Sequence, residues 1–373
     1  MHVDKRAWFR VSVSIALVLS LGHAAEADNG FNALSDVFTY SGFGTAGLAH
    51  SDISDAEWIQ STQSLGSSDN FDYKSDSKLA IQGTVSPTQW LSGTAQVLTE
   101  QRTGPDFTTR FEWAYIKMKP LPGLSIRGGE LELPTFLVSD SRNIGYANTW
   151  LRAPDEVYGE AYFDTYHGYD ITYQHGVGPY TLSVNALAGA AVTNLPLLGT
   201  ETSLQGHELR GYNATLDMGT ISVRVGRITT GYTVGLGPYF VGHGNYSFDS
   251  VGGTYDNSKL VIQSEFIERR TNYPNYNVNG MYLLGGYRLG KWMPYGIYAA
   301  GQSLGGNSAS GFVSSVSKHT VSAGVRLDWF QNVDFKAQFD HSTGSVNGDP
   351  FTNVQPAFDN SANVVSLAVD FVF

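Results

Sequence analysis

The chain ends with the residues Asn363-Val364-Val365-Ser366-Leu367-Ala368-Val369-Asp370-Phe371-Val372-Phe373. Every second residue from Val365 to Phe373 is large and apolar, whereas the set between them includes Ser366 and Asp370. Successive side chains of a β-strand point to opposite faces, so this segment predicts a strand with one continuous apolar face and one mixed face. Similar alternation recurs upstream, and it therefore decides the fold class of the whole chain.

Residues 1–27 have the pattern of a secretory signal peptide. Three basic residues precede an apolar stretch at 11–21, and Ala25-Glu26-Ala27 offers small residues at the two positions that a signal peptidase requires. The apolar stretch is too short for a membrane-spanning helix, which needs about 20 residues. We therefore expect residues 28–373 to form the mature protein, although cleavage two or three residues earlier stays open.

The composition favours β-structure and excludes several classes of protein. The chain has 42 Gly, 21 Tyr, 20 Phe and no Cys, so a disulfide framework is excluded. Its formal net charge of −11 argues against nucleic acid as a partner. A slightly negative mean hydropathy suits a membrane barrel, whose strands carry polar side chains inside and apolar ones outside. A soluble, acidic, secreted β-protein is the alternative interpretation of composition alone.

Sixteen alternating segments separated by turn signals predict a single closed barrel of antiparallel strands. Counts of 14 or 18 strands stay open, because weak segments are easily miscounted. The predicted strands are residues 37–50, 79–85, 91–99, 110–118, 124–131, 162–174, 180–188, 209–216, 221–228, 246–255, 260–269, 281–288, 293–300, 319–329, 333–340 and 365–373.

The predicted connections alternate between short turns and longer loops. Short turns on one rim and long loops on the other are typical of outer-membrane barrels, in which the long loops face the outside. We expect the longer loops at residues 51–78, 102–107, 134–159, 193–208, 230–245, 272–277, 303–317 and 341–362.

Charged residues within the predicted strands indicate which face lines the barrel. In Ile221-Ser222-Val223-Arg224-Val225 the apolar residues face lipid, so Arg224 faces the interior. The same alternation places Arg127, Arg326 and Lys336 inside. An Arg or Lys on the lipid face near the membrane midplane would cost about 2–4 kcal/mol. A ring of inward charges needs water, so we expect a hydrated channel.

Aromatic residues cluster near the ends of the predicted segments. Such residues suit the girdles that mark the membrane interfaces, although ordinary β-propensity also explains them. The candidates are Trp90, Trp113, Tyr115, Trp292, Tyr295, Trp329, Phe330, Phe371 and Phe373.

The layout of the mature chain resembles that of the general porins of Gram-negative bacteria, and the final strand resembles their closing strand. In these porins the third loop folds into the lumen and narrows it, with acidic loop residues facing basic residues of the wall. Residues 133–158 are rich in Trp, Tyr, Phe, Ile and Leu, as such a buried loop would be. The porin loop pattern Pro-Glu-Phe-Gly-Gly is absent, and residues 142–158 instead resemble a less-studied group of proteobacterial porin-like proteins.

The resemblance implies a set of pore-constriction residues and an assembly signal. The loop candidates are Asp140, Arg142, Arg152, Asp155 and Glu156, and the wall candidates are Arg110, Arg127, Arg224, Arg326 and Lys336. A salt-bridged loop anchor is the alternative role for Arg152, Asp155 and Glu156. The terminal Phe373, with Phe371, would be recognised by the barrel-assembly machinery.

The function that this resemblance implies is passive diffusion of small hydrophilic solutes and ions across the bacterial outer membrane. The alternative is a substrate-specific channel for an organic acid or a sugar. Outer-membrane lipid, lipopolysaccharide and two further copies of the chain, in a homotrimer, are the expected partners. We expect no enzyme, cofactor or metal site, because the histidines lie scattered at turns and loops without a recognisable catalytic spacing.

Overall fold

The computed structural model describes residues 37–60, 63, 65–102, 104–197, 200–236, 239–272, 277–304, 317–344, 350–356 and 358–373. The expected signal peptide, residues 1–27, lies outside these ranges, as do parts of several expected loops. Tyr40–Phe373 is one compact unit, and the barrel described below belongs to it apart from the first two residues of its first strand.

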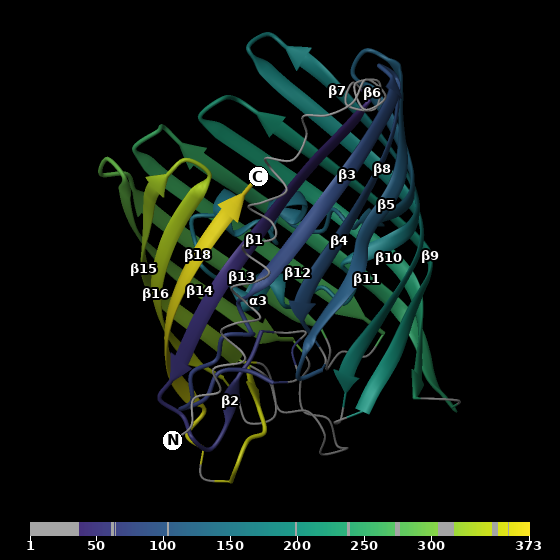
Figure 1. Ribbon diagram of the computed structural model, residues 1–373. Helices are drawn as coiled ribbons and strands as arrows, with labels where there is room; N and C mark the ends of the chain where they lie inside the picture. The colour runs from purple at the N-terminus through teal and green to yellow at the C-terminus, as the bar shows by residue number, and fades with distance from the viewer. Residues whose placement is uncertain are drawn as a thin grey trace, which may run out of the picture. The chain divides into compact units, whose positions relative to one another are not determined.

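Sixteen antiparallel strands close into one barrel (Figure 1), which confirms the predicted architecture and strand count. Consecutive strands pair with each other, and β18 closes the barrel by pairing with both β16 and β1. The barrel strands are β1 (Phe38–Ser51), β3 (Lys78–Thr88), β4 (Leu91–Gln101), β5 (Phe107–Leu121), β6 (Leu124–Glu132), β7 (Thr165–Val177), β8 (Tyr180–Leu197), β9 (Thr200–Asp217), β10 (Ile221–Leu236), β11 (Tyr239–Asp256), β12 (Leu260–Thr271), β13 (Val278–Tyr287), β14 (Trp292–Ser303), β15 (Ser317–Phe330), β16 (Val333–Thr343) and β18 (Ser361–Val372).

Side-chain exposure follows the alternation expected from the sequence. On β10, Val223 and Val225 are 40% and 48% exposed, whereas Arg224 between them is 6% exposed. On β18, the outward face carries the apolar set that ends at Phe373, and Asp370 is buried on the other face. On these two strands the apolar groups therefore point to the surroundings, and Arg224 and Asp370 point inside.

Two of the expected long loops are wrong, because the neighbouring strands continue through them. β8 and β9 pair as far as Leu197 and Thr200, and β10 and β11 pair as far as Leu236 and Tyr239. The pairing of these strands shifts in register after Gly189 and after Val234. These irregularities let the hydrogen bonds between the strands continue into residues whose side chains no longer alternate between apolar and polar. Strand length is thus set here by pairing with the neighbour.

Three of the nine expected girdle aromatics point to the other face. Tyr295 is buried and its hydroxyl donates a hydrogen bond to Gln338 Oε1 at 2.9 Å. Trp113 Nε1 donates to Gln82 Oε1 at 3.0 Å, and the Tyr115 ring receives the Arg127 guanidinium at 5.4 Å. The Tyr295 hydroxyl, the Trp113 N–H group and the π-face of Tyr115 each contact a polar or charged side chain, and the lipid face would offer no such partner.

The long-loop rim carries a small second sheet that the sequence did not predict. Strands β2 (Glu57–Trp58) and β17 (Phe351–Thr352) pair there, although they lie almost 300 residues apart in the chain. Trp58, Phe351 and Phe358 pack with Val364 in one apolar cluster under this sheet. No helix within the described ranges is long and apolar enough to span a membrane.

Candidate functional site

The segment between β6 and β7, residues 133–164, is called the third loop below. It contains two 3₁₀ turns, η1 (Ser139–Ser141) and η2 (Gly145–Ala147), and the single-turn helix α3 (Asp155–Tyr158). α3 starts after Pro154 and carries two acidic residues in its first turn, where the exposed N–H groups favour negative charge. Short turns of this kind keep a long loop compact without a continuous helix.

Apolar side chains fix the third loop against the wall formed by β11 to β14. Val157 is completely buried, and Phe136 and Trp150 are 2% exposed. The Trp150 ring lies 5.6 Å from the Tyr282 ring and the Phe136 ring lies 5.5 Å from the Phe248 ring, each edge to face. The large apolar content that the sequence showed in this segment is thus used for packing.

Cations of the wall hold the backbone of the third loop. Lys336 Nζ donates to the carbonyl oxygen of Gly145 at 2.6 Å. Arg326 Nη1 donates to the carbonyl oxygens of Tyr146 and Asn148 at 2.8 and 2.9 Å. Arg224 donates to the carbonyl oxygens of residues 134 and 135. These three wall cations therefore use their N–H groups on the loop.

Two of these cations, Arg326 and Lys336, also have carboxylate partners on the wall itself. Arg326 pairs with Asp334 at 3.0 Å, and Lys336 pairs with Asp370 at 3.0 Å. The remaining wall candidates are paired in the same way: Arg127 with Asp170 at 2.6 Å, and Arg110 with Glu100 and Glu112 at 2.6 and 2.5 Å. The structure does not bring any of the five wall candidates into an ion pair with Asp140, Asp155 or Glu156 within the described residues.

The charged loop residues find other partners, which the sequence did not single out. Arg152 binds Asp76 through two nitrogens, contacts Asp340 at 3.2 Å and stacks over the Trp58 ring at 4.7 Å. Asp155 pairs with Lys318 at 3.0 Å.

The other loop candidates differ in how completely they are engaged. Arg142 pairs with Asp164 at 2.8 Å, and Glu156 Oε1 accepts a hydrogen bond from Thr320 at 2.6 Å. Asp140 is exposed and has no ion pair among the residues that the structure describes. Asp164 lies in the third loop like Arg142, 22 residues further along the chain, whereas Asp76, Asp340, Lys318 and Thr320 belong to other segments. Spacing in the sequence therefore carried no signal for these partners.

Burial and neighbouring charge shift the pKa values of the loop carboxyls in opposite directions. Burial raises the pKa of Glu156 above its ordinary value. Burial acts in the same direction on Asp164, but the guanidinium groups of Arg142 and Arg102 outweigh it and hold the pKa of Asp164 at about 2. Lys318 and Arg269 likewise lower the pKa of Glu160 against the effect of burial. The loop thus keeps firmly ionised acids beside one that protonates more readily.

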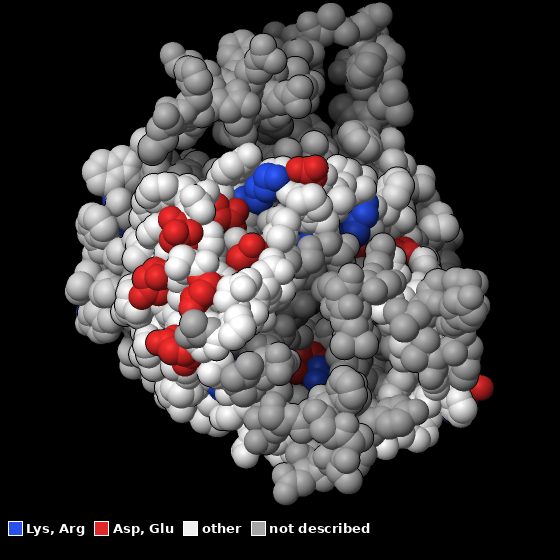
Figure 2. Space-filling model, turned by 90° about the horizontal axis from the view of Figure 1, so that it is seen from below, with Lys and Arg blue, Asp and Glu red and all other residues white. Residues whose placement is uncertain are grey.

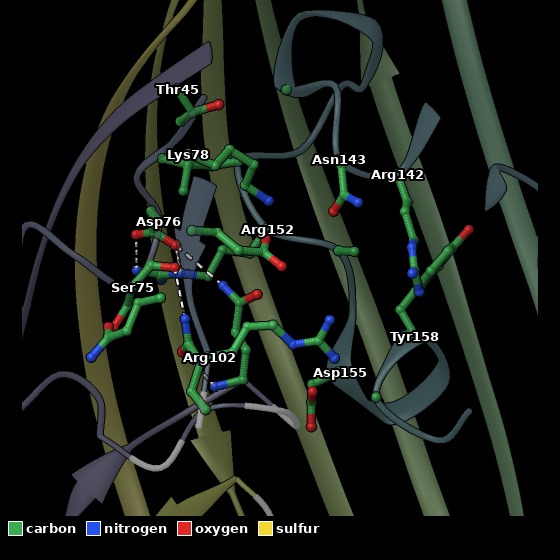
Figure 3. A pocket seen from close by; sticks show the side chains of 18 of the residues that line it. Thr45, Ser75, Asp76, Lys78, Arg102, Arg142, Asn143, Arg152, Asp155 and Tyr158 are labelled. Carbon is green, nitrogen blue, oxygen red and sulfur yellow. Dashed lines mark hydrogen bonds and ion pairs between the residues drawn. The ribbon is translucent and has the colours of Figure 1, made fainter. Parts of the chain in front are cut away.

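A polar cavity of about 130 Å³ lies between the third loop and the wall of β1, β3, β4 and β5. Figure 3 shows Asp76 and Lys78 on one side of this space and Arg142, Asn143 and Tyr158 on the other. Its charged lining consists of Lys78, Arg102, Arg110, Arg142, Arg152, Asp76, Glu100, Asp155 and Asp164.

Lys78 and Arg102 of this lining were missed in the sequence. Lys78 is the first residue of β3 and Arg102 directly follows β4, and a charge at such a position in a sequence is usually interpreted as a solvated strand end. Among the described residues Lys78 has no ion pair, although the register places it opposite Glu100.

The long-loop rim above this cavity is acidic. Residues 51–77 contain six carboxylates, Asp52, Asp55, Glu57, Asp69, Asp72 and Asp76, with Lys74 as the one basic residue of this stretch. Figure 2, which looks onto this rim, shows acidic groups gathered on one side and a hollow in which an acidic and a basic group are visible. Within the described residues no group of His, Cys, Asp and Glu could hold a metal ion.

Solved structures with the same fold are outer-membrane proteins. The barrel is similar to Salmonella typhi OmpF in complex with daunomycin (13% identity, 90% of this chain and 97% of that one, TM-score 0.59) and to the anion-selective porin of Comamonas acidovorans (12%, 90% and 99%, 0.56). It is also similar to the trimer form of Vibrio cholerae OmpT (14%, 91% and 100%, 0.56). No family model and no curated protein matches the sequence. The chain therefore has a general-porin-like fold, that of an outer-membrane barrel.

Proposed function

We propose that this porin-like barrel is a water-filled channel for the passive diffusion of small hydrophilic solutes and ions across the bacterial outer membrane. The observation that carries the proposal is the sorting of side chains by face. The outward positions Val223 and Val225 are apolar and exposed, whereas Arg224, Lys336 and Asp370 are buried on the opposite face. A barrel of 16 strands is wide enough to leave an aqueous interior rather than a packed one.

We infer that the third loop lies inside this barrel and sets its narrowest point. Its backbone is bound by Arg326 and Lys336, on β15 and β16 at the far side of the barrel from β6, and by Arg224 on β10, four strands from β6. All three side chains come from the inward positions of their strands. The cavity between the loop and β3 to β5 is then the remaining passage, lined by charges of both signs.

A channel selective for small organic acids is the second candidate. It is favoured by the cations of the cavity, because Lys78, Arg102, Arg110 and Arg142 converge on it from three strands and the loop. Guanidinium groups bind carboxylates through paired hydrogen bonds, so such a cluster suits a carboxylate solute better than a neutral sugar.

The proposal includes the expected assembly of the protein. Residues 1–27 would direct export, Phe371 and Phe373 would be read by the barrel-assembly machinery, and three copies would associate. The outward position of both rings supports the second of these steps, since their centroids lie 6.4 Å apart on the apolar face. The trimer form of Vibrio cholerae OmpT, a protein of the same fold, supports the third.

Single-channel recording in planar bilayers tests the channel and the role of the loop together. The matched variant replaces residues 144–149 with two glycines, which keeps the Trp150 and Arg152 contacts. We expect ion conduction by the native protein and a conductance that is about two-fold higher in the variant, because the passage widens. A folded native barrel that carries no current would refute the channel. Equal conductance of the two proteins would refute the constriction but not the channel.

A further inference from the structure

The loop that follows β1 contributes a second face to the polar cavity. Residues 52–60, 63 and 65–77, between β1 and β3, are called the first loop below. Four polar residues of this loop line the cavity together with the third loop: Gln60, Gln63, Ser75 and Asp76. Figure 3 shows Ser75 and Asp76 across the space from the third-loop residue Asn143. The cavity thus lies between two loops as well as against the wall.

The side chains of the first loop are fixed where they line the cavity. Gln63 Nε2 donates to the carbonyl oxygen of Ser75 at 2.8 Å, and Gln60 Nε2 donates to Asp76 Oδ1 at 3.2 Å. Asp76 also lies directly against the wall, because a Cβ added at Gly47 of β1 would overlap the Cβ of Asp76. Gln63, Ser75 and Asp76 are all buried. At this point the loop is therefore part of the packed interior of the protein.

A segment near the end of the chain holds the first loop in this place. Residues 350–356 and 358–360, between β16 and β18, are called the last loop below. β2 of the first loop pairs with β17 of the last loop, and beside this pairing Ile59 N donates to the carbonyl oxygen of Pro350 at 2.8 Å. The rings of Phe351 and Phe358 lie 4.7 Å apart, edge to face, and pack with Trp58. Burial of these rings stabilises a pairing of strands that have only two residues each.

Arg152 of the third loop is held between two residues of the first loop. Its guanidinium lies over the Trp58 ring at 4.7 Å and donates two hydrogen bonds to Asp76. The Trp58 indole N–H donates to Ser342 Oγ on β16 at 3.2 Å, which fixes the ring. Stacking on an aromatic face and pairing with a carboxylate together fix both the position and the direction of a guanidinium. The position of the third loop therefore depends on the first loop, and through it on the last loop.

We propose that the first loop is a second constriction element of the channel. Gln60, Gln63 and Asp76 form one face of the passage and the third loop forms another, while the last loop holds the first loop in place through Phe351 and Phe358. This inference rests on the proposed channel and adds a specificity-determining segment to it. The amides of Gln60 and Gln63 give the passage neutral hydrogen-bonding groups beside the charges of the wall.

The chain has no cysteine, so single introduced thiols can test the proposal in single-channel recordings. Gln60→Cys places a thiol on the proposed face, and Asn70→Cys, at an exposed position of the same loop, is the matched control. A methanethiosulfonate reagent forms a mixed disulfide with the thiolate and releases sulfinate. We expect this modification of Gln60→Cys to lower the conductance by about half or more, because the passage narrows. A cationic and an anionic reagent should shift the anion-to-cation permeability ratio in opposite directions, and the control should change in neither measurement.

A second variant tests the hold of the last loop on the first. Phe351→Ala removes one ring from the apolar cluster with Trp58 and leaves every charge in place. We expect its conductance to be about two-fold higher than that of the native protein, because the first loop is released from the passage. Phe339→Ala, on the outward face of β16, is the matched control and should conduct like the native protein. Heat-dependent gel migration verifies that each barrel is folded.

Several results would overturn the proposal. Unchanged conductance after complete modification of Gln60→Cys would remove the first loop from the passage, and so would a thiol that does not react in a conducting channel. An equal drop in Asn70→Cys would show that any group attached to the rim obstructs the current. Equal conductance of Phe351→Ala and Phe339→Ala would show that the last loop does not hold the first. In all these cases the native barrel conducts and the channel proposal stands, whereas a native barrel without current would refute that proposal instead.

Discussion

The two sides of the third loop use the same kinds of charge differently. Toward β10 to β16 and β18, called the anchored side, Arg326 and Lys336 donate to loop carbonyls and are neutralised by wall carboxylates. Toward β3 to β5, called the open side, Lys78 and Arg102 line a cavity; Arg102 pairs with Asp164 at 3.2 Å, whereas Lys78 has no ion pair among the described residues. A cation whose N–H groups already donate to backbone carbonyls has few hydrogen-bond donors left with which to bind a solute. A side chain that points inward is therefore not, for that reason alone, part of the lining of the proposed channel.

The largest expected effect comes from the residue that joins the two sides. Arg152 binds Asp76 just before β3 on the open side and Asp340 on the anchored side, and all three are buried. Arg152→Ala leaves two buried carboxylates without their cation, so we expect a loss of about 3–5 kcal/mol in the free energy of unfolding. Urea unfolding in detergent, followed by tryptophan fluorescence, measures it.

The control for this variant is Arg288→Ala, which removes an exposed pair with Asp256 and should cost less than about 1 kcal/mol. Similar losses in the two variants would mean that Arg152 is no more than a surface ion pair, and the two sides would then be independent.

A smaller effect should appear in acid on the open side. The pKa of Asp164 is about 2, below its ordinary value of 3.8, so the ionised form stabilises the fold. That contribution is complete above about pH 4 and is lost as the pH falls toward 2, and it amounts to about 2 kcal/mol. Asp164→Asn should remove this part of the pH dependence in unfolding measurements between pH 5 and 2. An unchanged acid slope in the variant would show that Arg142 and Arg102 do not hold this carboxylate.

Ion selectivity should respond most to the open side. A unit charge at about 7 Å in water changes the energy of a permeating ion by about RT, with opposite signs for anions and cations. Lys78→Gln should therefore shift the anion-to-cation permeability ratio toward cations by a factor of about seven. Reversal potentials in a salt gradient measure this ratio. Lys259→Gln, at an exposed short turn, is the matched control and should leave the ratio unchanged. A shift of equal size in the control would place the selective charge outside the cavity.

The smallest effect is expected from two cations that lie away from the open side, Arg127 on β6 and Arg224 on the anchored side, although two charges are removed. Arg127 is neutralised by Asp170, and Arg224 is buried against loop carbonyls. The double variant Arg127→Gln with Arg224→Gln should therefore change the permeability ratio by less than about two-fold, because neither charge acts alone on the passage. A larger shift than that of Lys78→Gln would reverse the comparison between the two sides.

The sequence by itself determined the barrel, its sixteen strands and the face of most side chains. These follow from a period of two along each strand, which is local and is imposed by the different surroundings of the two faces. The alternation around Arg224 and Asp370 could be read without any knowledge of neighbouring strands. The extensions of β8 to β11 could not be predicted in this way, because these strands go on pairing with their neighbours in residues where the apolar and polar side chains no longer alternate.

The tertiary structure alone decided which charges meet and which remain available. Arg152 finds Asp76 and Asp340, which lie 76 and 188 residues away, because the loop brings three remote segments together. Alternation places a side chain inside the barrel but not at a given height or across from a given partner. The role of each inward charge depends on the path of the third loop, which divides the wall into an anchored side and an open side.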